Sequence, residues 1–411
     1  MKRVVITAAE SLCAAGTSRN VLMQALQRNE CLGVPSGYTL PIALVGRYID
    51  DLPDHSDFVD DRKSLLGWKC AAIALREAEW SRESRPNDRM VVFVGTGLSS
   101  ITPYEMNEDL FGHIVDGAFD REAMAKDVRT DRAAPKRHMP HHFGKRLAQS
   151  VNAIRSGSNF SACAAASQAI AAGFWSVRRG ESHIALVGGH DSMDHPMGLL
   201  SFLVLGALSP NTCKPFDHGR NGFMLGEGAG MLVLESYEHA VGRGAPILAE
   251  ILGAGSSMDA WNPTAPHPDG VGAERAMRRA LKDASLSPES VDYVNAHGTG
   301  TPLGDVAESQ AIHRLFGESV FVSSIKGAIG HCIAAAGAVE AVACVGMIEE
   351  GWMAGTTGLL SCDSECPSNN LSTPCSVPPN VIVSNSFGFG GQNASLVFAS
   401  PQFADHHYSN L

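Results

Sequence analysis

Short runs of β-branched and other apolar residues alternate along the chain with longer segments in which apolar residues recur at helical spacing. The strands expected from this pattern are Arg3–Thr7, Met90–Val94, Ile184–Gly188, Met231–Leu234, Val291–Asn295, Val320–Ser323 and Val381–Ser384. The helices expected between them are Lys63–Trp80, Cys163–Arg179, Gly272–Ala284, Asp305–Phe316 and Ala334–Glu349. Strands that alternate with helices predict mostly parallel sheets with helices on both faces, so the expected fold class is α/β.

The alternation is interrupted once near the middle of the chain, at Ser236–Ala245. Each side of this break holds several strand and helix alternations, which is compatible with two similar halves, although the pattern alone does not establish a duplication. We place the two domains at residues 1–245 and 246–411. The longest segment without periodicity, Trp352–Asn380, is rich in Ser, Pro, Asn and Cys and is predicted to be a surface excursion before the last strands.

Composition narrows the class of protein. The 411 residues are 44% hydrophobic and 18% charged, which is typical of a globular protein. The net charge of -11 disfavours general binding to nucleic acid or to anionic lipid. No uninterrupted apolar stretch approaches the roughly 18 residues of a membrane helix, and Glu10 interrupts the apolar start too early for a signal peptide. We therefore expect a cytoplasmic protein that binds neither nucleic acid nor membrane.

The ten cysteines are scattered without paired spacing, so reduced thiols are expected. Cys362, Cys366 and Cys375 lie close together in sequence, which raises a zinc site as an alternative. Their segment contains no Cys-x-x-Cys pair and no histidine, which favours incidental thiols. No metal site is predicted.

The sequence around Cys163 is suited to a nucleophilic role. The small and polar residues 158–161 precede it, and the run CAAASQAIAAGFWSVRR that it begins has high helix propensity. A thiol at a helix N-terminus meets unpaired N–H groups and the positive end of the helix dipole, so a lowered pKa and a nucleophilic role are expected. The competing interpretation is a buried cysteine that packs as a small hydrophobe.

Two histidines occupy comparable positions later in the chain. His297, in NAHGTGTPLGD, follows the expected strand Val291–Asn295, and His331, in KGAIGHCIAAAG, follows the Gly-rich turn after the strand at Val320. Both should lie at carboxyl ends of strands, where open α/β sheets bind their ligands. Each alone would more often be packed or solvated. Together with Cys163 they form a nucleophile and two groups that handle protons or donate to an oxyanion.

These stretches, with FSACAAASQAI, KPFDHGRNGFMLGEGAGMLVLE and NSFGFGGQNAS, resemble in kind and order the motifs of the elongating β-ketoacyl-[acyl-carrier-protein] synthases, which are ketosynthases of the thiolase superfamily. The resemblance covers nearly the whole chain. It implies a thiolase-like fold, in which two similar βαβαβ halves form a five-layered α-β-α-β-α arrangement, and an obligate dimer. The first half would carry the nucleophilic cysteine and the second half the two catalytic histidines.

The resemblance also implies a decarboxylative Claisen condensation in fatty-acid or polyketide chain elongation. Cys163 would accept an acyl chain from the phosphopantetheine arm of an acyl carrier protein. Malonyl-acyl-carrier protein would then lose carbon dioxide and attack that acyl group to give a β-ketoacyl product. His297 and His331 would stabilise the enolate that decarboxylation forms. No bound cofactor is implied, because the phosphopantetheine arm belongs to the substrate.

Further roles follow from the same motifs. Lys326 and Glu308 match positions of a polar network that supports the histidines, and an ordinary structural ion pair is the alternative. The backbone N–H groups of Cys163 and Phe389 would form the oxyanion hole. Phe389 would also gate the acyl pocket opposite Phe202, for which core packing is the alternative.

Three threonines match positions that bind the pantetheine arm, namely Thr299 and Thr301, with Thr264 in addition; turn stabilisation is the alternative for all three. The chain also departs from the family's pattern. Gly206 stands where the fatty-acid enzymes often carry an arginine that contributes to carrier docking. Gly300 stands where serine is common, a variant typical of polyketide enzymes.

Related classes differ at diagnostic positions. A degradative thiolase would carry a second cysteine in the motif SFGFGGQNAS, and an initiating ketosynthase would have asparagine in place of His331. A chain-length factor would lack Cys163. The open alternative is that this chain is one subunit of a type II polyketide ketosynthase/chain-length-factor heterodimer that makes a specialised chain, for example a polyene. A Cys-His hydrolase also stays formally open.

The expected partners are an acyl carrier protein and a second subunit, which is either a copy of this chain or a chain-length factor. Carrier proteins are acidic, whereas this chain is itself acidic, so a local basic patch is expected to dock the carrier. The available clusters are Arg62–Lys63, Lys136–Arg137 and Lys145–Arg146.

Overall fold

One large mixed sheet organises the chain in the computed structural model. The structure describes residues 1–37, 44–47, 49–50, 52–53, 55, 58, 61–81, 88–97, 113–115, 118–123, 126, 139–193 and 195–410. Within them, the strands of the large sheet follow the spatial order β13-β12-β11-β14-β15-β10-β1-β9-β8-β4-β7.

The N-terminal half of this sheet has five strands. They are β1 (Val4–Leu12), β4 (Met90–Thr96), β7 (Arg155–Asn159), β8 (Ile184–Asp191) and β9 (Gly228–Ser236). β4 pairs in parallel with β7 and β8, whereas β9 pairs antiparallel with β8 and β1. Every residue of β1, β8 and β9 is buried, as expected for strands covered on both faces.

The C-terminal half repeats this pairing. Its strands are β10 (Ala249–Met258), β11 (Tyr293–Asn295), β12 (Phe321–Ser323), β14 (Val381–Gly388) and β15 (Gln392–Ala399), with the short β13 (Asn369–Asn370) added beside β12. β11 pairs in parallel with β12 and β14, and β15 pairs antiparallel with β14 and β10. The halves join where β1 and β10 pair antiparallel at Val5–Glu250 and Ile6–Ala249.

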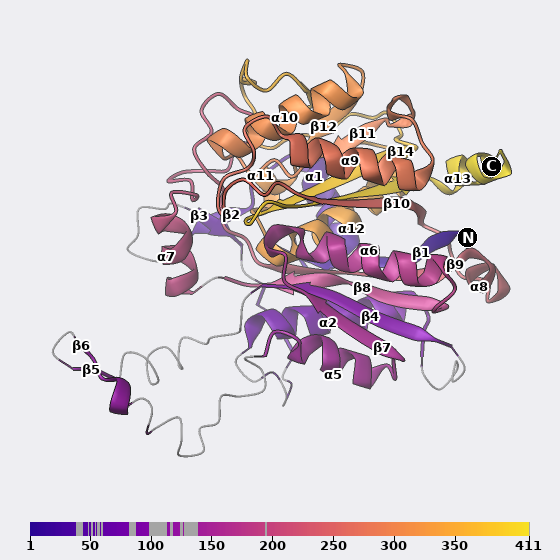
Figure 1. The fold of residues 1–411 in the computed structure, drawn as a ribbon, viewed down its shortest axis with the longest axis horizontal. Helices are drawn as coiled ribbons and strands as arrows, with labels where there is room; N and C mark the ends of the chain where they lie inside the picture. The colour runs from indigo at the N-terminus through magenta and orange to yellow at the C-terminus, as the bar shows by residue number, and fades with distance from the viewer. Residues whose placement is uncertain are drawn as a thin grey trace.

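Helices form three layers around these strands (Figure 1). α6 (Ala165–Arg178) and α12 (Ala336–Glu350) lie between the two half-sheets, and their apolar residues share one core cluster with β1, β8 and β14. α2 (Arg62–Glu77) and α5 (His142–Ser150) pack on the outer face of the N-terminal half, and α9 (Val271–Ala284) and α10 (Pro302–Phe316) on that of the C-terminal half. This confirms the predicted thiolase-like order α-β-α-β-α.

The remaining described elements are shorter. They are α1 (Arg19–Arg28), α7 (Pro196–Val204), α8 (Tyr237–Gly242), α11 (Lys326–Ile329), α13 (Pro401–Ser409), the 3-10 turns η4 (Ala162–Ala164), η5 (Pro288–Ser290) and η6 (Ile333–Ala335), and the pairs β2 (Gly33–Pro35) with β3 (Leu44–Gly46) and β5 (Ile114–Val115) with β6 (Ala118–Phe119). No helix in the described ranges is long and apolar enough to cross a membrane. The domain boundary after residue 245 lies between α8 and β10 and stays a prediction.

The structure corrects the first part of the predicted surface excursion Trp352–Asn380, whereas most residues from 360 to 380 are exposed or half-buried, as predicted. Residues 352–357 are buried rather than exposed, and β13 within this segment pairs with β12. Individual hydrogen bonds satisfy the irregular main chain, such as the N–H of Thr356 to the carbonyl of Leu371 at 2.8 Å. The segment has no periodicity because it runs along the end of the sheet as irregular backbone. All ten cysteines are free, as predicted.

Candidate active site

Cys163 lies in η4, between the end of β7 and the start of α6. The residue before it, Ala162, has a φ of 46°, a left-handed conformation that non-glycine residues seldom adopt. The same turn recurs in the second half, where Ile333 also has a φ of 46° ahead of α12. The strained turn brings the Cys163 side chain to the wall of a cavity, with only 7% of the residue exposed.

His331 approaches Cys163 from the other half of the fold. Its Nε2 lies 3.1 Å from the Sγ of Cys163. The main chain holds it there, since its N–H donates to the carbonyl of Met224 at 2.8 Å and its carbonyl accepts the N–H of Gly226 at 3.0 Å. The ring of Phe223 packs edge-on against the imidazole with centroids 5.1 Å apart.

His297 completes the cluster just after β11. Its ring lies nearly perpendicular to that of His331, with centroids 5.3 Å apart, and the potential ligand atoms of Cys163, His297 and His331 all lie within 4.8 Å of one another. The Nδ1 atoms of both histidines are buried without a hydrogen-bond partner among the described residues. The structure therefore brings together the three residues that the sequence singled out.

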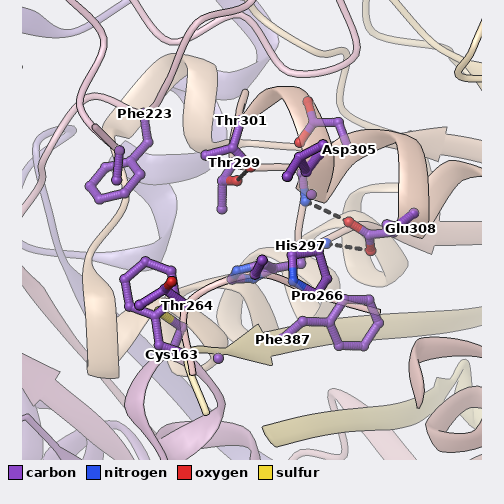
Figure 2. A pocket seen from close by; sticks show the side chains of 18 of the residues that line it. Cys163, Phe223, Thr264, Pro266, His297, Thr299, Thr301, Asp305, Glu308 and Phe387 are labelled. Carbon is purple, nitrogen blue, oxygen red and sulfur yellow. Dashed lines mark hydrogen bonds between the residues drawn. The ribbon is translucent and has the colours of Figure 1, made fainter. Parts of the chain in front are cut away.

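Glu308 holds the main chain of His297. Its two carboxylate oxygens accept the N–H groups of His297 and Gly298, each at 2.8 Å (Figure 2). The side-chain amide of Asn385 also donates to Glu308 at 3.2 Å. Burial raises the pKa of Glu308 to about 7, although these donors oppose the shift.

Lys326 reaches the same histidine from behind. Its Nζ donates to the carbonyl of His297 at 2.5 Å and forms a buried ion pair with Glu340 of α12. Lys326 and Glu308 thus both contact the His297 main chain, but the ion pair of Lys326 is with Glu340. Sequence reasoning missed Glu340. The available signal was a single acid within the apolar helical run of residues 336–348, where an acid needs a buried partner.

Burial decides the charge state of the cluster. It lowers the pKa of His297 and His331 well below the usual histidine value, and the Lys326 cation lowers both further. Burial also raises the pKa of Cys163 to about 12, more than the Lys326 cation lowers it. The lowered pKa expected from the helix N-terminus is therefore wrong, because desolvation of a buried thiolate outweighs the favourable dipole. At neutral pH the cluster is a thiol beside two neutral imidazoles.

The cluster opens into a cavity of about 400 Å³. Nine of the ten predicted site residues line it, and Lys326 alone lies behind it. The nine are Cys163, Phe202, Thr264, His297, Thr299, Thr301, Glu308, His331 and Phe389. The hydroxyls of Thr299 and Thr301 are 2.9 Å apart, and Thr264 is exposed. Phe223, Asp305 and Phe387 also line the cavity (Figure 2) and were not predicted. They stand within the motifs KPFDHGRNGF, HGTGTPLGD and NSFGFGGQNAS, respectively.

The hairpin between β14 and β15 closes one side of this cavity. A Cβ atom at Gly388 would lie 2.8 Å from the carbonyl oxygen of Ser161 and 3.1 Å from the backbone nitrogen of Cys163, so a glycine is needed for this close approach. Phe389 follows it and faces Phe202, with ring centroids 6.5 Å apart. The predicted pair of aromatic residues therefore meets at the cavity.

The structure supports the predicted basic clusters less well than the predicted cavity residues. Arg62 forms an ion pair with Glu227 and Lys63 is buried, so this cluster does not present two cations to a partner. Lys136–Arg137 lies outside the described residues. Lys145 is exposed on α5, on the outer face of the N-terminal half.

The three cysteines weighed as zinc ligands do not converge. Among the described residues, the one set of three ligand side chains close enough to share an ion is Cys163, His297 and His331. Cys362 is exposed, Cys366 is buried and Cys375 is half-buried.

Comparison with known proteins identifies two family models. The model described as "Beta-ketoacyl synthase, N-terminal domain" matches residues 53–240, and "Beta-ketoacyl synthase, C-terminal domain" matches residues 248–359. Nodulation protein E of Rhizobium meliloti is 38% identical, over 97% of this chain and 99% of the relative. 3-oxoacyl-[acyl-carrier-protein] synthase 2 of Staphylococcus aureus is 35% identical, over 85% of this chain and 87% of the relative.

Two solved structures have the same fold. One is a type II polyketide synthase acyl-carrier protein in complex with its ketosynthase bound to the hexaketide, with 28% identity, 97% of this chain and 99% of that chain covered, and a TM-score of 0.84. The other is the ishigamide ketosynthase/chain length factor, with 29% identity, the same coverage of 97% and 99%, and a TM-score of 0.83.

Proposed function

The chain belongs to the β-ketoacyl synthase family, and from this premise we propose that it condenses an acyl group held on Cys163 with malonyl-acyl-carrier protein. The observation that carries the proposal is the 3.1 Å contact between Nε2 of His331 and Sγ of Cys163, beside His297 and inside the cavity. The product is a β-ketoacyl-carrier protein, one step of fatty-acid or polyketide chain elongation.

In the first half-reaction the acyl group moves from the carrier's thioester to Cys163. The Cys163 S–H bond and the thioester C–S bond break, a new thioester forms at Sγ, and the thiol proton ends on the released pantetheine sulfur. His331 Nε2 lies within reach of the Sγ proton and can relay it. The N–H groups of Cys163 and Phe389 would donate to the oxyanion of the tetrahedral intermediate.

In the second half-reaction malonyl-carrier protein occupies the same cavity. Its C–CO₂⁻ bond breaks, carbon dioxide leaves, and the electron pair passes to the thioester oxygen as an enolate. Two neutral imidazoles serve this charge as N–H donors, and the lowered pKa values of His297 and His331 keep them neutral at pH 7. The enolate carbon then attacks the acyl-Cys163 carbonyl and the bond to Sγ breaks. The released Cys163 thiolate takes up a proton from solvent, which His331 Nε2 can relay, and the thiol is regenerated.

Glu308 and Lys326 act in this proposal as positioning residues. They hold the two sides of the His297 peptide, one by accepting its N–H and the other by donating to its carbonyl. Thr299, Thr301 and Thr264 would hydrogen-bond the pantetheine arm near the cavity mouth. No resident cofactor is required, since Cys163 carries the acyl group.

The proposed partners are an acyl carrier protein and a second subunit. The carrier is supported by the names of the Staphylococcus aureus relative and of the hexaketide-bound ketosynthase complex, both of which include an acyl carrier protein. The second subunit is supported by β7, which ends the large sheet in the described chain and leaves Arg155 and Ser156 exposed. Such an edge strand is a template for pairing with another chain. The ten free thiols support a cytoplasmic location.

A second candidate function differs from the first in the identity of the second subunit. The ishigamide ketosynthase is similar to this chain and is named with a chain length factor, so this chain could be the catalytic subunit of such a heterodimer making a specialised polyketide. Co-expression with candidate chain-length factors, followed by native mass spectrometry, distinguishes a heterodimer from a homodimer.

The condensation itself is tested with purified protein, an acyl-carrier protein and malonyl-carrier protein. Intact-mass analysis of the carrier should show a product two carbons longer as a β-ketoacyl thioester, and peptide mass spectrometry should find the acyl intermediate on Cys163. An acyl group found on another of the ten cysteines, or hydrolysis without chain extension, would refute the proposal.

A further inference from the structure

The two halves of the fold contain the same strained turn, but only the first turn carries the nucleophile. Ala162 and Ile333 both have a φ of 46°, and each begins a 3-10 turn that leads into a central helix, α6 or α12. The residue after the strained position is Cys163 in the first half and Ala334 in the second. The N–H of Ala334 is therefore the counterpart of the N–H of Cys163.

The strands beside these turns also correspond. β8 and β14 each have eight residues and pair antiparallel with the next strand of their half, β9 or β15. Their last residues, Asp191 and Gly388, each pair with the first residue of that next strand. Asp191 is therefore the counterpart of Gly388, and the next residue, Ser192, is the counterpart of Phe389.

These correspondences define a second copy of the oxyanion hole. The proposed hole consists of the N–H groups of Cys163 and Phe389, so its copy consists of the N–H groups of Ala334 and Ser192. We name the N–H groups of Ala334 and Ser192 the second anion hole.

The two holes differ in what occupies them. Gly388 has no side chain, and a Cβ there would lie only 3.1 Å from the backbone nitrogen of Cys163, so glycine leaves this donor open to a substrate oxygen. In the second half, Oδ2 of Asp191 accepts the N–H of Ala334 at 3.1 Å. A carboxylate of the protein itself thus takes the place that a substrate oxyanion would take in the first half.

Stability alone gives little reason for an acid at this position. Asp191 is 1% exposed, and its Oδ1 is buried without a hydrogen-bond partner among the described residues. Burial raises the pKa of its carboxyl, although the Lys63 cation and the N–H groups of Ala334 and Ser192 oppose the shift. Burial of an acid with one oxygen unpaired is unfavourable. The benefit of Asp191 therefore lies in the donors that its other oxygen meets.

The hydrogen bond to Ala334 fixes the segment that follows His331. Ala334 is three residues after His331, and the strained Ile333 lies between them. A left-handed φ persists at a non-glycine residue only where its surroundings hold it. Ile333 lines the cavity, and Nε2 of His331 contacts Sγ of Cys163. Relaxation of this turn would displace both the cavity wall and that contact.

We propose that Asp191 is a positioning residue of this enzyme, whose carboxylate fills the second anion hole and thereby holds the Ile333–Ala334 turn and His331 in place. Asp191 is not among the described residues that line the cavity, so it acts through His331. The proposal rests on the proposed function, because it assigns Asp191 to the decarboxylation that His331 serves. It predicts that loss of the acceptor, rather than loss of the negative charge, slows this step.

The test measures carbon dioxide release from malonyl-carrier protein by the full chain and its variants. Asp191→Ala leaves the N–H of Ala334 without an acceptor. Its kcat should fall about tenfold or more, since displacement of a reacting group by about 1 Å costs up to about 100-fold. KM should change less than about twofold, because substrate binding is unaltered. Asp191→Asn keeps an oxygen in the same place without the charge, so its kcat should stay within about threefold of the wild type.

The matched control is Asp292→Ala. Asp292 also accepts backbone N–H groups, those of Asn380 and Val381 at 2.8 and 3.0 Å, but it precedes β11 whereas His297 follows that strand. This variant should lose the same kind of hydrogen bond far from the reacting groups. Its Tm should fall while its kcat stays unchanged.

Formate provides a readout that a purely structural role would not give. In Asp191→Ala the emptied second anion hole should bind this small carboxylate. Compared with sodium chloride at the same concentration, about 0.1 M sodium formate should raise the Tm of this variant and increase its kcat by about threefold or more. The wild type and Asp191→Asn should show neither effect, because their hole is filled.

Three outcomes would overturn the proposal. If Asp191→Ala keeps the wild-type kcat while its Tm falls, Asp191 has a structural role only. If Asp191→Asn is slow, charge rather than acceptance of the N–H is what matters, and this comparison decides even where Asp191→Ala does not fold. If formate acts equally on the wild type, no hole has been emptied. Absence of both decarboxylation and condensation in the wild type would instead refute the proposed function, whereas the formate-dependent Tm of Asp191→Ala would still show whether Asp191 fills the hole.

Discussion

Nε2 of His331 lies 3.1 Å from Sγ of Cys163, although the two residues are 168 positions apart in the chain and belong to opposite halves of the fold. Both side chains are buried, and burial favours the neutral form of each, since it raises the pKa of the thiol and lowers that of the imidazole. The contact is therefore a neutral hydrogen bond rather than a thiolate–imidazolium ion pair. The thiolate forms only as the proton leaves during acyl transfer.

Alkylation of Cys163 should report this charge state. Because the pKa of Cys163 is raised from 9.0 to about 12, its rate of labelling by iodoacetamide should keep rising with pH beyond 9. At pH 7 the exposed Cys31 and Cys362 should be labelled faster, since both are accessible. Peptide-resolved mass spectrometry of a labelling time course measures all three rates. A plateau for Cys163 near pH 9, or faster labelling than of Cys31 at pH 7, would contradict the neutral pair.

Glu308 should give a defined dependence of stability on pH. Burial raises the pKa of its carboxyl from 4.5 to about 7 in the folded protein. Between these values the folded state keeps a proton that the unfolded chain releases. Its contribution to stability is therefore full below about pH 4.5 and is lost as pH rises towards 7. Glu308→Gln removes this titration, so the Tm difference between variant and wild type should change between pH 5 and 8, as measured by calorimetry.

Comparison of Glu308→Gln with the wild type isolates the titration of Glu308, because the other buried carboxyls are present in both proteins. The pH dependence of decarboxylation provides the matching control. Wild-type decarboxylation should decline below about pH 7, where protonated Glu308 can no longer accept the N–H groups of both His297 and Gly298. Glu308→Gln should be slow throughout and lack that acid limb. A constant Tm difference from pH 5 to 8 would show that Glu308 does not titrate in this range.

Substitutions in the Lys326–Glu340 pair should affect stability and catalysis separately. Lys326→Met leaves the carboxylate of Glu340 buried and unpaired, which typically costs about 3–5 kcal/mol of unfolding free energy. Adding Glu340→Gln removes that charge, so chemical denaturation should show most of the stability restored. Decarboxylation should stay impaired in kcat with little change in KM, because the carbonyl of His297 still lacks its donor. Recovery of kcat in the double variant would leave Lys326 with a structural role only.

Much of the fold could be predicted because buried strands such as β4 and β8 are continuous apolar runs. β10 and β15 were missed because their sequences, AEILGAGSSM and QNASLVFA, are rich in small and polar residues. Packing explains that composition: a Cβ at Gly255 of β10 would lie 2.2 Å from the carbonyl oxygen of Ala276 in α9. Close approach of a helix selects small residues, and the result resembles a turn when only the sequence is read.

The residues of the candidate site likewise divide into those that local sequence predicts and those that it does not. Cys163, His297 and His331 each follow a strand and precede a Gly- or Ala-rich segment, so local sequence marks them. Glu340 lies in the middle of a helix, and its partner Lys326 is set by how α11 and α12 pack together. The pKa of Cys163 was predicted in the wrong direction because the helix N-terminus is visible in the sequence, whereas the burial that outweighs it depends on both halves of the fold.

His331→Ala should affect the two half-reactions unequally. It removes one of two donors to the developing enolate, a loss of about 2.7–4 kcal/mol, or roughly 100- to 1,000-fold in decarboxylation rate. Acylation of Cys163 should fall less, since the backbone N–H groups at the start of α6 stay in place. Carbon dioxide release and acyl-enzyme mass measure the two steps separately. Equal losses in both would mean that His331 acts mainly on the thiol proton.

Cys163→Gln should abolish condensation but leave malonyl decarboxylation running. The glutamine amide is neutral and roughly fills the space of an acylated cysteine, so its carbonyl oxygen can occupy the oxyanion hole while His297 and His331 see a cavity like that of the loaded enzyme. The neutral side chain also fits the surroundings, because burial favours the uncharged form at this position. Released carbon dioxide, measured from malonyl-carrier protein without an acyl donor, reports the step. Cys163→Ala is the matched control, since it removes the thiol without filling the acyl position and should decarboxylate more slowly than the glutamine variant. If Cys163→Gln stays folded but loses decarboxylation as completely as condensation, then Cys163 takes part in both steps and the assignment of decarboxylation to the histidines is wrong.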